Sequence, residues 1–299
     1  MNQSSDLSTY QIEGEPFGNG EFSTNYKAKD RRKQKYFIIK KIKSDLVKTE
    51  EEQNLLMREN YLQASFHHAS ILELVGITIP FQDQKYYALI TPFMPNGDLK
   101  NLIEQVSIGN APENWETLKS INMIGIAAGM AYMHQKNFIH QDLRPEHIVL
   151  DENNFPKIIG FHCSKLYKSK KQPLPIYSAP ELLENSNYTN KIDVFSYGML
   201  IYYLLTLEVP WSHIEGIDSH ELSKLVSEGK RPELRDKEIP NGTKKLIEKC
   251  WSNDPNDRPS FIQIVKMITE NKEDFFDLSL VDEEQLCDYI ELITTCLPI

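Results

Sequence analysis

Few features of this sequence point to an extracellular or membrane-bound protein. The 299 residues include only four cysteines, and none of them forms a C-x-x-C pair or a metal-ligand spacing. The longest apolar run, residues 197–207, falls well short of the roughly 20 residues that cross a bilayer. Residues 1–11 are polar and contain no signal-peptide core. We therefore expect a cytoplasmic protein in a reducing compartment, without membrane insertion.

Positive charge is also in short supply. The sequence has 33 Lys and Arg against 43 Asp and Glu, which gives a formal net charge of −10. A broad nucleic-acid surface needs an excess of positive charge, so we expect no nucleic-acid partner. The short basic run at 27–43 is better explained as a sheet edge that lysine protects from pairing. Hydrophobic residues make up 40% of the chain, which is enough for a substantial core.

The hydrophobic pattern divides the chain into a β-rich part and a helical part, which is an α+β composition. Residues 36–39 and 86–90 have the composition of strands, and residues 49–66 have apolar side chains at helical spacing. Beyond residue 95 the pattern is mainly helical. Asp98 is a candidate helix N-cap, and residues 192–207 are apolar nearly all round, as in a central core helix. Further short strands are expected near residues 138–139, 147–150 and 157–159.

Two short segments carry the most specific chemical signal. Residues 140–143 read H-Q-D-L, and residues 160–162 read G-F-H. In order and spacing they resemble the H-R-D-L-x-x-x-N and D-F-G motifs of the eukaryotic protein-kinase family. The resemblance implies that Asp142 is the catalytic base and that Arg144 is the basic residue of the catalytic loop. Gln141 stands where an Arg usually clamps an activation-loop phosphate, and a neutral amide cannot form that ion pair.

The two positions that hold metal ions in this family are substituted. His147 stands at the Asn position and Gly160 at the D-F-G Asp position. Magnesium prefers oxygen ligands in octahedral geometry, whereas Gly160 has no side chain and a histidine nitrogen suits zinc or copper. His147 and His162 have no third ligand, so we expect them to make local hydrogen bonds. We therefore expect no metal site and no Mg²⁺; no cofactor is certain, and ATP stays open.

The nucleotide-binding motifs match the family pattern better than the metal positions do. Residues 18–23 read G-N-G-E-F-S and resemble the glycine-rich loop, which approaches phosphates through backbone N–H groups. In kinases a lysine of the third strand pairs with a glutamate of the following helix to position ATP. The nucleotide-binding residues that the resemblance implies are Gly18, Gly20, Lys40, Glu59, the gatekeeper Thr91 and the hinge residue Met94.

One neighbour of the lysine opposes nucleotide binding. Ile38 stands two residues before Lys40, where the family usually has alanine against the adenine. Alternation along a strand puts both side chains on one face, so the isoleucine is expected to obstruct the base. If Lys41 is the family's lysine instead, Ile39 takes the same place and the conclusion holds.

The residues that hold the kinase fold together are present. Residues 179–181 read A-P-E, and Arg258 follows in the helical part. The resemblance implies a buried bidentate ion pair between Glu181 and Arg258. It also implies that Asp193, at the start of the central helix, braces the catalytic loop.

The resemblance covers about residues 10–272 and is closest to the tyrosine-kinase-like group. It implies a bilobal α+β fold, with a small β-rich N-lobe that contains one main helix and a larger, mainly helical C-lobe. The acidic amphipathic C-terminal tail either packs back on the helical lobe or docks a partner. The expected parts are a flexible tail at 1–9, the N-lobe at 10–94, the C-lobe at 95–272 and the C-terminal tail at 273–299, with a helix at 280–294.

Three functions fit this pattern of retained and substituted residues. The first is a pseudokinase that acts as a signalling scaffold or switch by binding protein partners, with Asp142 kept only as a structural residue of its loop. The second is a weak or atypical ATP-dependent Ser/Thr or Tyr protein kinase with Asp142 as base. The third is a sensor that binds ATP without turnover. The first is favoured, because the substitutions fall on phosphate, metal, adenine and phosphate-clamp positions and spare the residues that hold the fold.

Overall fold

A computed structural model describes residues 9–19, 23–43, 49–78, 87–160, 175–184, 187–214, 216–235 and 239–298. The chain forms two compact units, which are described separately. The described residues of the first unit lie within Met1–His67 and Leu72–Pro95, and those of the second lie within His68–Ile71, Asn96–Gly160 and Lys171–Ile299. Apart from Thr9, the expected flexible tail lies outside the described residues.

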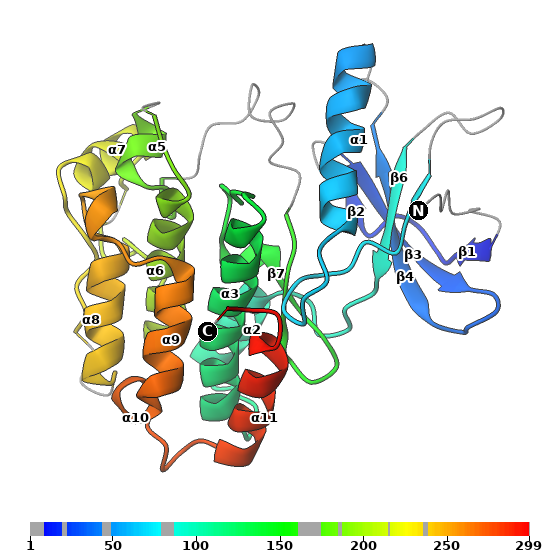
Figure 1. The fold of residues 1–299 in the computed structure, drawn as a ribbon. Helices are drawn as coiled ribbons and strands as arrows, with labels where there is room; N and C mark the ends of the chain where they lie inside the picture. The colour runs from blue at the N-terminus through cyan, green and yellow to red at the C-terminus, as the bar shows by residue number, and fades with distance from the viewer. Residues whose placement is uncertain are drawn as a thin grey trace. The chain divides into compact units, whose positions relative to one another are not determined.

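The first unit is an antiparallel sheet with one helix (Figure 1). Its strands pair in the order β1-β3-β4-β6-β5, and β2 pairs with β3. The strand predicted at 36–39 is confirmed as part of β4, and the helix predicted at 49–66 is confirmed as α1. The elements are β1 Tyr10–Ile12, β2 Gly18–Asn19, β3 Ser23–Asp30, β4 Tyr36–Ile42, α1 Glu50–Ala64, β5 Gly76–Thr78 and β6 Ala88–Pro92.

Alternation along β4 buries both faces of this sheet. Phe37 and Ile39 point to one face, where they form a core cluster with residues of β3 and β6. Ile42 points to the opposite face and packs with Leu74 and Leu89. Because side chains two apart share a face, Ile38 and Lys40 lie on the same face as Ile42.

The second unit is mainly helical and is built around two buried helices (Figure 1). The central core helix predicted at 192–207 is confirmed as α6, whose residues are buried from Ile192 to Leu204. α3 packs against α6, α9 and α11, and α6 also packs against α8. The elements are α2 Leu99–Ser107, α3 Trp115–Gln135, η3 Pro145–His147, β7 Ile148–Leu150, β8 Pro156–Ile158, α5 Pro180–Leu183, α6 Lys191–Thr206, α7 Ser219–Ser227, α8 Asn241–Cys250, η4 Pro255–Asp257, α9 Phe261–Glu270, α10 Lys272–Phe275 and α11 Glu283–Thr294.

Side-chain caps explain where two of these helices begin. Asp98 accepts a hydrogen bond from the backbone N–H of Asn101 at 2.9 Å, which confirms the predicted N-cap of α2. The tail helix α11 begins at Glu283 rather than at 280, because Asp282 caps it by accepting the N–H of Gln285.

The strands predicted near 147–150 and 157–159 are confirmed as the β7–β8 hairpin. The strand predicted at 138–139 is wrong. The backbone of this segment runs as a connection after α3, with the N–H of Phe138 bonded back to the carbonyl of Met133. The amides that follow bond to a side chain rather than to a neighbouring strand.

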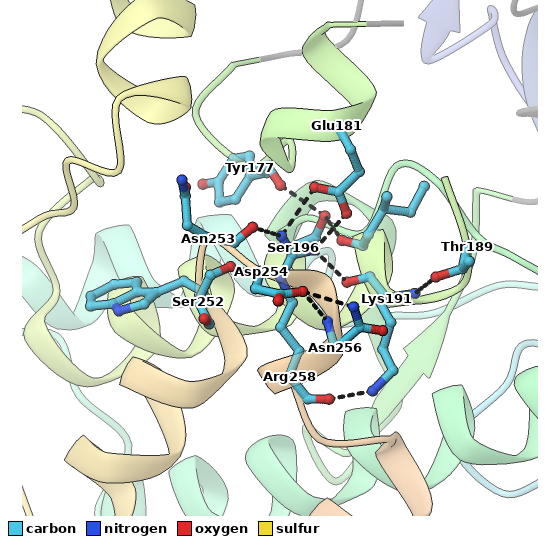
Figure 2. A network of polar contacts seen from close by, with 12 residues as sticks. Tyr177, Glu181, Thr189, Lys191, Ser196, Ser252, Asn253, Asp254, Asn256 and Arg258 are labelled. Atoms are coloured by element: carbon cyan, nitrogen blue, oxygen red, sulfur yellow. Dashed lines mark hydrogen bonds and ion pairs between the residues drawn. The ribbon is translucent and has the colours of Figure 1, made fainter. Parts of the chain in front are cut away.

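A buried arginine ties four segments of the second unit together (Figure 2). Arg258 is 1% exposed, and its guanidinium donates to both carboxylate oxygens of Glu181 at 2.6 and 3.0 Å. Its remaining N–H groups donate to the backbone carbonyls of Ser252, Lys191 and Asn253. All five donors of the guanidinium are therefore satisfied, which is the condition under which a buried charge is tolerated.

Replacing Arg258 by methionine is expected to lower the free energy of unfolding by roughly 3–5 kcal/mol, because the carboxylate of Glu181 would be left without its partner. Urea denaturation measures the change. Arg235→Met is the matched control, since the contact of Arg235 with Glu233 lies at the surface, with the two side chains 75% and 68% exposed. Its loss should change stability far less, because solvent screens an exposed ion pair. Equal effects of the two substitutions would contradict the role given to the buried pair.

Candidate functional site

The loop that carries the kinase-like catalytic motif is held by one buried carboxylate of α6. Asp193 is fully buried. Its Oδ2 accepts the N–H of His140 at 2.8 Å, and its Oδ1 accepts the N–H of Gln141 at 2.7 Å. The ring of His134 contacts Oδ2 at 2.9 Å. Gln141 has a φ of 72°, a left-handed conformation that costs a non-glycine residue about 1 kcal/mol or more. The carboxylate stabilises that conformation by accepting hydrogen bonds from both backbone amides.

The candidate base Asp142 lies between two basic side chains. Its Oδ1 is 3.3 Å from Nε of Arg144, and its Oδ2 is 3.5 Å from Nδ1 of His147. Nδ1 of His147 also lies 2.7 Å from the backbone carbonyl of Asp142. A carbonyl only accepts, so the proton of the neutral imidazole is assigned to Nδ1. The structure thus brings together the two residues that the sequence predicts as catalytic, and adds His147 to them.

His147 fills the space in front of Gly160. Gly160 has a φ of +99°, and a Cβ added there would lie 2.8 Å from Nδ1 and 2.9 Å from Cγ of His147. The ring of His140 would be 3.2 Å away. An aspartate cannot occupy this position without moving the histidine ring, and its backbone conformation is one that side chains disfavour. The substitutions at the two metal positions therefore fit each other sterically.

The donors that remain do not fit a magnesium ion. Gly160 provides no side-chain oxygen, and Nδ1 of His147 is committed to a backbone carbonyl. Within the described part of the chain, no group of three or more His, Cys, Asp or Glu side chains is placed to hold a metal. Asp151, another acid between these two positions, caps its own turn by accepting the N–H groups of Asn153 and Phe155.

In the first unit, the β4 register places the predicted nucleotide residues on one sheet face. Ile38 lies directly opposite the gatekeeper position Thr91, and Lys40 lies opposite Leu89. The isoleucine therefore stands on the lysine's face beside the gatekeeper, as the sequence predicts. Met94 is half-buried in the segment after β6.

The glycine-rich segment is only partly described. Gly18 pairs with Asn25 across β2 and β3, and a Cβ at Gly18 would lie 3.2 Å from Nδ2 of Asn25. A side chain at this position would therefore press on the amide of Asn25. Gly20 and the side chain of Glu59 lie outside the described residues, so the predicted Lys40–Glu59 pair stays a prediction.

The sequence places His147 and Gly160 at the family's two metal positions, but it does not predict that they pack against each other. Nothing in the residue pattern indicates that His147 lies against Gly160, because the contact depends on the left-handed backbone at Gly160. The substitution of an aspartate by glycine, the residue that adopts positive φ most readily, is the signal that could have suggested it.

Burial of His147 predicts a loss of stability in mild acid. Desolvation, only partly offset by the Asp142 carboxylate, lowers the pKa of His147 from 6.5 to about 4. The unfolded chain then binds a proton that the folded chain refuses, so the free energy of unfolding falls as pH drops from about 6.5 to about 4. Each pKa unit corresponds to about 1.4 kcal/mol.

Urea denaturation between pH 7 and pH 5 tests this expectation, because most carboxylates are still ionised there. His147→Asn should make the pH dependence shallower. His213→Asn, at an exposed position, is the matched control and should leave it unchanged. An identical slope in wild type and His147→Asn would show that this histidine does not contribute.

Comparisons with known proteins identify the family. The protein kinase domain model matches residues 11–268. A probable serine/threonine-protein kinase of Dictyostelium discoideum is 31% identical over 268 residues, which cover 85% of this chain and 19% of that protein. The dual specificity protein kinase shkB of the same organism is 31% identical over 258 residues, which cover 83% of this chain and 38% of the relative.

A plant relative gives the same result. The serine/threonine-protein kinase VIK of Arabidopsis thaliana is 32% identical over 227 residues, which cover 71% of this chain and 49% of VIK. The chain thus spans about half or less of the length of these relatives. No helix among the described residues is long and apolar enough to cross a membrane. The α+β bilobal architecture, the catalytic-type loop and these matches agree, and the chain belongs to the protein kinase domain family.

Proposed function

We propose that this chain is a pseudokinase of the tyrosine-kinase-like group, a kinase domain that serves signalling by binding protein partners in the cytoplasm. The observation that carries the proposal is the contact between His147 and Gly160, because the chain's own imidazole occupies the space that the Cβ of a side chain at residue 160 would need. We assign the domain to residues 10–272, with lobes at 10–94 and 95–272, followed by the tail at 273–299.

The energetics of phosphoryl transfer support this reading. Kinases lower the barrier mainly by positioning the phosphates and neutralising their charge with metal ions. Losing one such electrostatic contact reduces the rate by about 10²–10³, and here both metal anchors are substituted. Asp142 alone offers general-base catalysis, which is worth about 10²–10⁴ and which cannot replace the missing cations.

The relatives are named as serine/threonine and dual specificity kinases, so phosphotransfer is the competing function. Three kinase-like nucleotide positions, Gly18, Lys40 and Thr91, are retained on the described part of the first sheet. ATP binding without turnover therefore stays an alternative, and the side chain of Ile38 is the expected obstacle to the adenine.

The purified chain is expected to transfer no phosphate from ATP to a basic protein substrate above the level of Asp142→Asn, with Mg²⁺ or with Mn²⁺. It is also expected to show no metal-dependent rise in melting temperature with ATP, whereas a ligand at 100 times its Kd adds about 2.7 kcal/mol. Transfer that Asp142→Asn abolishes would establish a kinase and overturn the proposal. A metal-independent shift that Lys40→Ala removes would select the ATP sensor instead.

Restoring the D-F-G carboxylate alone is expected to fail. Gly160→Asp should destabilise the domain by several kcal/mol, because its Cβ meets the His147 ring and its φ is positive. In the double variant His147→Asn/Gly160→Asp the smaller amide side chain can rotate away from residue 160, so the two changes should be coupled by about 1–3 kcal/mol in a double-mutant cycle. Thermal unfolding of the four proteins measures the coupling.

The double variant also regains the family's two metal-ligand residue types, so its melting temperature with ATP should respond to Mg²⁺ more than that of either single variant. Strictly additive stabilities would show that the two positions do not constrain each other, and would remove the main support for the proposal.

A further inference from the structure

The C-terminal helix α11 is an integral part of the second unit. Its inward residues Leu286, Tyr289 and Ile293 are 0%, 3% and 0% exposed. The helix packs along α3, and the two helices lie side by side in Figure 1. Its start is also fixed, because the N–H of Asp282 donates to the hydroxyl of Thr117 on α3 at 2.9 Å.

Two glycines of α3 leave space for close contacts, Gly125 for Tyr289 of the tail and Gly129 for Ser70. A Cβ added at Gly125 would lie 2.5 Å from the hydroxyl oxygen of Tyr289, and one at Gly129 would lie 3.2 Å from the backbone oxygen of Ser70. Residues four apart share one face of a helix, so α3 is bare where Tyr289 and Ser70 approach it. Glycine inside a helix costs roughly 0.5–1 kcal/mol relative to alanine. The close approach of these two residues offsets that cost.

The side chain of Tyr289 passes the bare face of α3 at Gly125 and contacts the segment that follows α1. Its hydroxyl lies 3.0 Å from the hydroxyl of Ser70, in a buried contact. Its ring packs against Phe155, with the centroids 4.8 Å apart. Tyr289 therefore joins α11, α3 and residue 70 through a single side chain.

His68 makes a second connection to the tail. Its Nδ1 accepts the N–H of Ser70 at 3.0 Å, so Nε2 carries the proton and donates to the carbonyl of Ile293 at 2.9 Å. Burial lowers the pKa of His68 to about 4, which keeps the ring neutral and this pair of bonds intact at pH 7.

These contacts involve a short segment that interrupts the first unit along the chain. His68–Ile71 belongs to the second unit, whereas the residues on both sides of it, up to His67 and from Leu72, belong to the first. We call this segment the tether. The β7–β8 hairpin also holds it, through Ile158, whose N–H donates to the carbonyl of Ser70 at 2.8 Å. The first unit thus leaves and re-enters the tether within a few residues.

We propose that α11 is a built-in clamp on the tether, and that its grip sets the mobility of α1, which ends at Ala64 just before the tether begins. α1 carries Glu59, which the family resemblance predicts as the partner of Lys40, so the clamp would connect α11 to a residue of the predicted nucleotide site. The proposal concerns a mechanical connection and holds whether or not the domain transfers phosphate.

Hydrogen exchange on the full-length chain tests the clamp. Tyr289→Phe removes only the hydroxyl that contacts Ser70, and a lost hydrogen bond of about 1 kcal/mol corresponds to about fivefold faster exchange. We expect that acceleration in residues 65–75 and in α1, with exchange in α6 and α8 unchanged. His68→Ala, which removes the bond to Ile293, should produce the same regional pattern.

Leu292→Ala is the matched control, because Leu292 lies on the outer face of the same helix and is 57% exposed. It should leave exchange in residues 65–75 and in α1 unchanged. Gly125→Ala provides a stronger release, since its methyl group would displace the Tyr289 hydroxyl. The clamp is overturned if Tyr289→Phe and His68→Ala accelerate exchange only within α3 and α11. It is equally overturned if they accelerate exchange uniformly across the second unit.

Discussion

The arrangement of the catalytic-type loop depends on one buried carboxylate. Asp193 has no exposed surface, and a buried charge is strongly unfavourable unless donors surround it. Its donors are the two successive amides of His140 and Gln141 and the ring of His134. Those amides converge on one side chain because Gln141 adopts a positive φ. The backbone that leads into Asp142 is therefore held by contacts of the fold itself.

A second constraint follows from the first. In this loop the His147 ring lies between the carbonyl of Asp142 and Gly160. The glycine accommodates the ring, and the ring in turn excludes any side chain at residue 160. Recovery of the metal site would therefore need two simultaneous changes, and either one alone meets a steric or a chemical obstacle. This mutual fit separates a stably altered site from one that has lost a single residue.

Much of the fold could be predicted from the sequence, because periodicity reports which faces are buried. The strand at 36–39, the cap at Asp98 and the apolar helix α6 follow from local patterns. The pairing of Arg258 with Glu181 came from the family resemblance, since no local rule connects residues so far apart. The strand expected at 138–139 was wrong because the amides after it bond to Asp193 instead of to a strand. No sequence pattern predicts the contact between Tyr289 and Ser70. The two glycines of α3 are the feature of the sequence that is related to it.

The distribution of satisfied and altered polar groups supports the proposed binding role. Arg258 has a partner for each of its five donors, and such networks contribute to a defined shape rather than to chemistry. The groups that would have to hold and neutralise phosphate are the ones replaced, at His147 and Gly160. On the proposed function, these networks keep a defined shape for a partner to recognise, and the substitutions at residues 147 and 160 take away the family's metal ligands. Protein partners recognise a surface by shape and charge, and their binding requires no metal at the substituted positions.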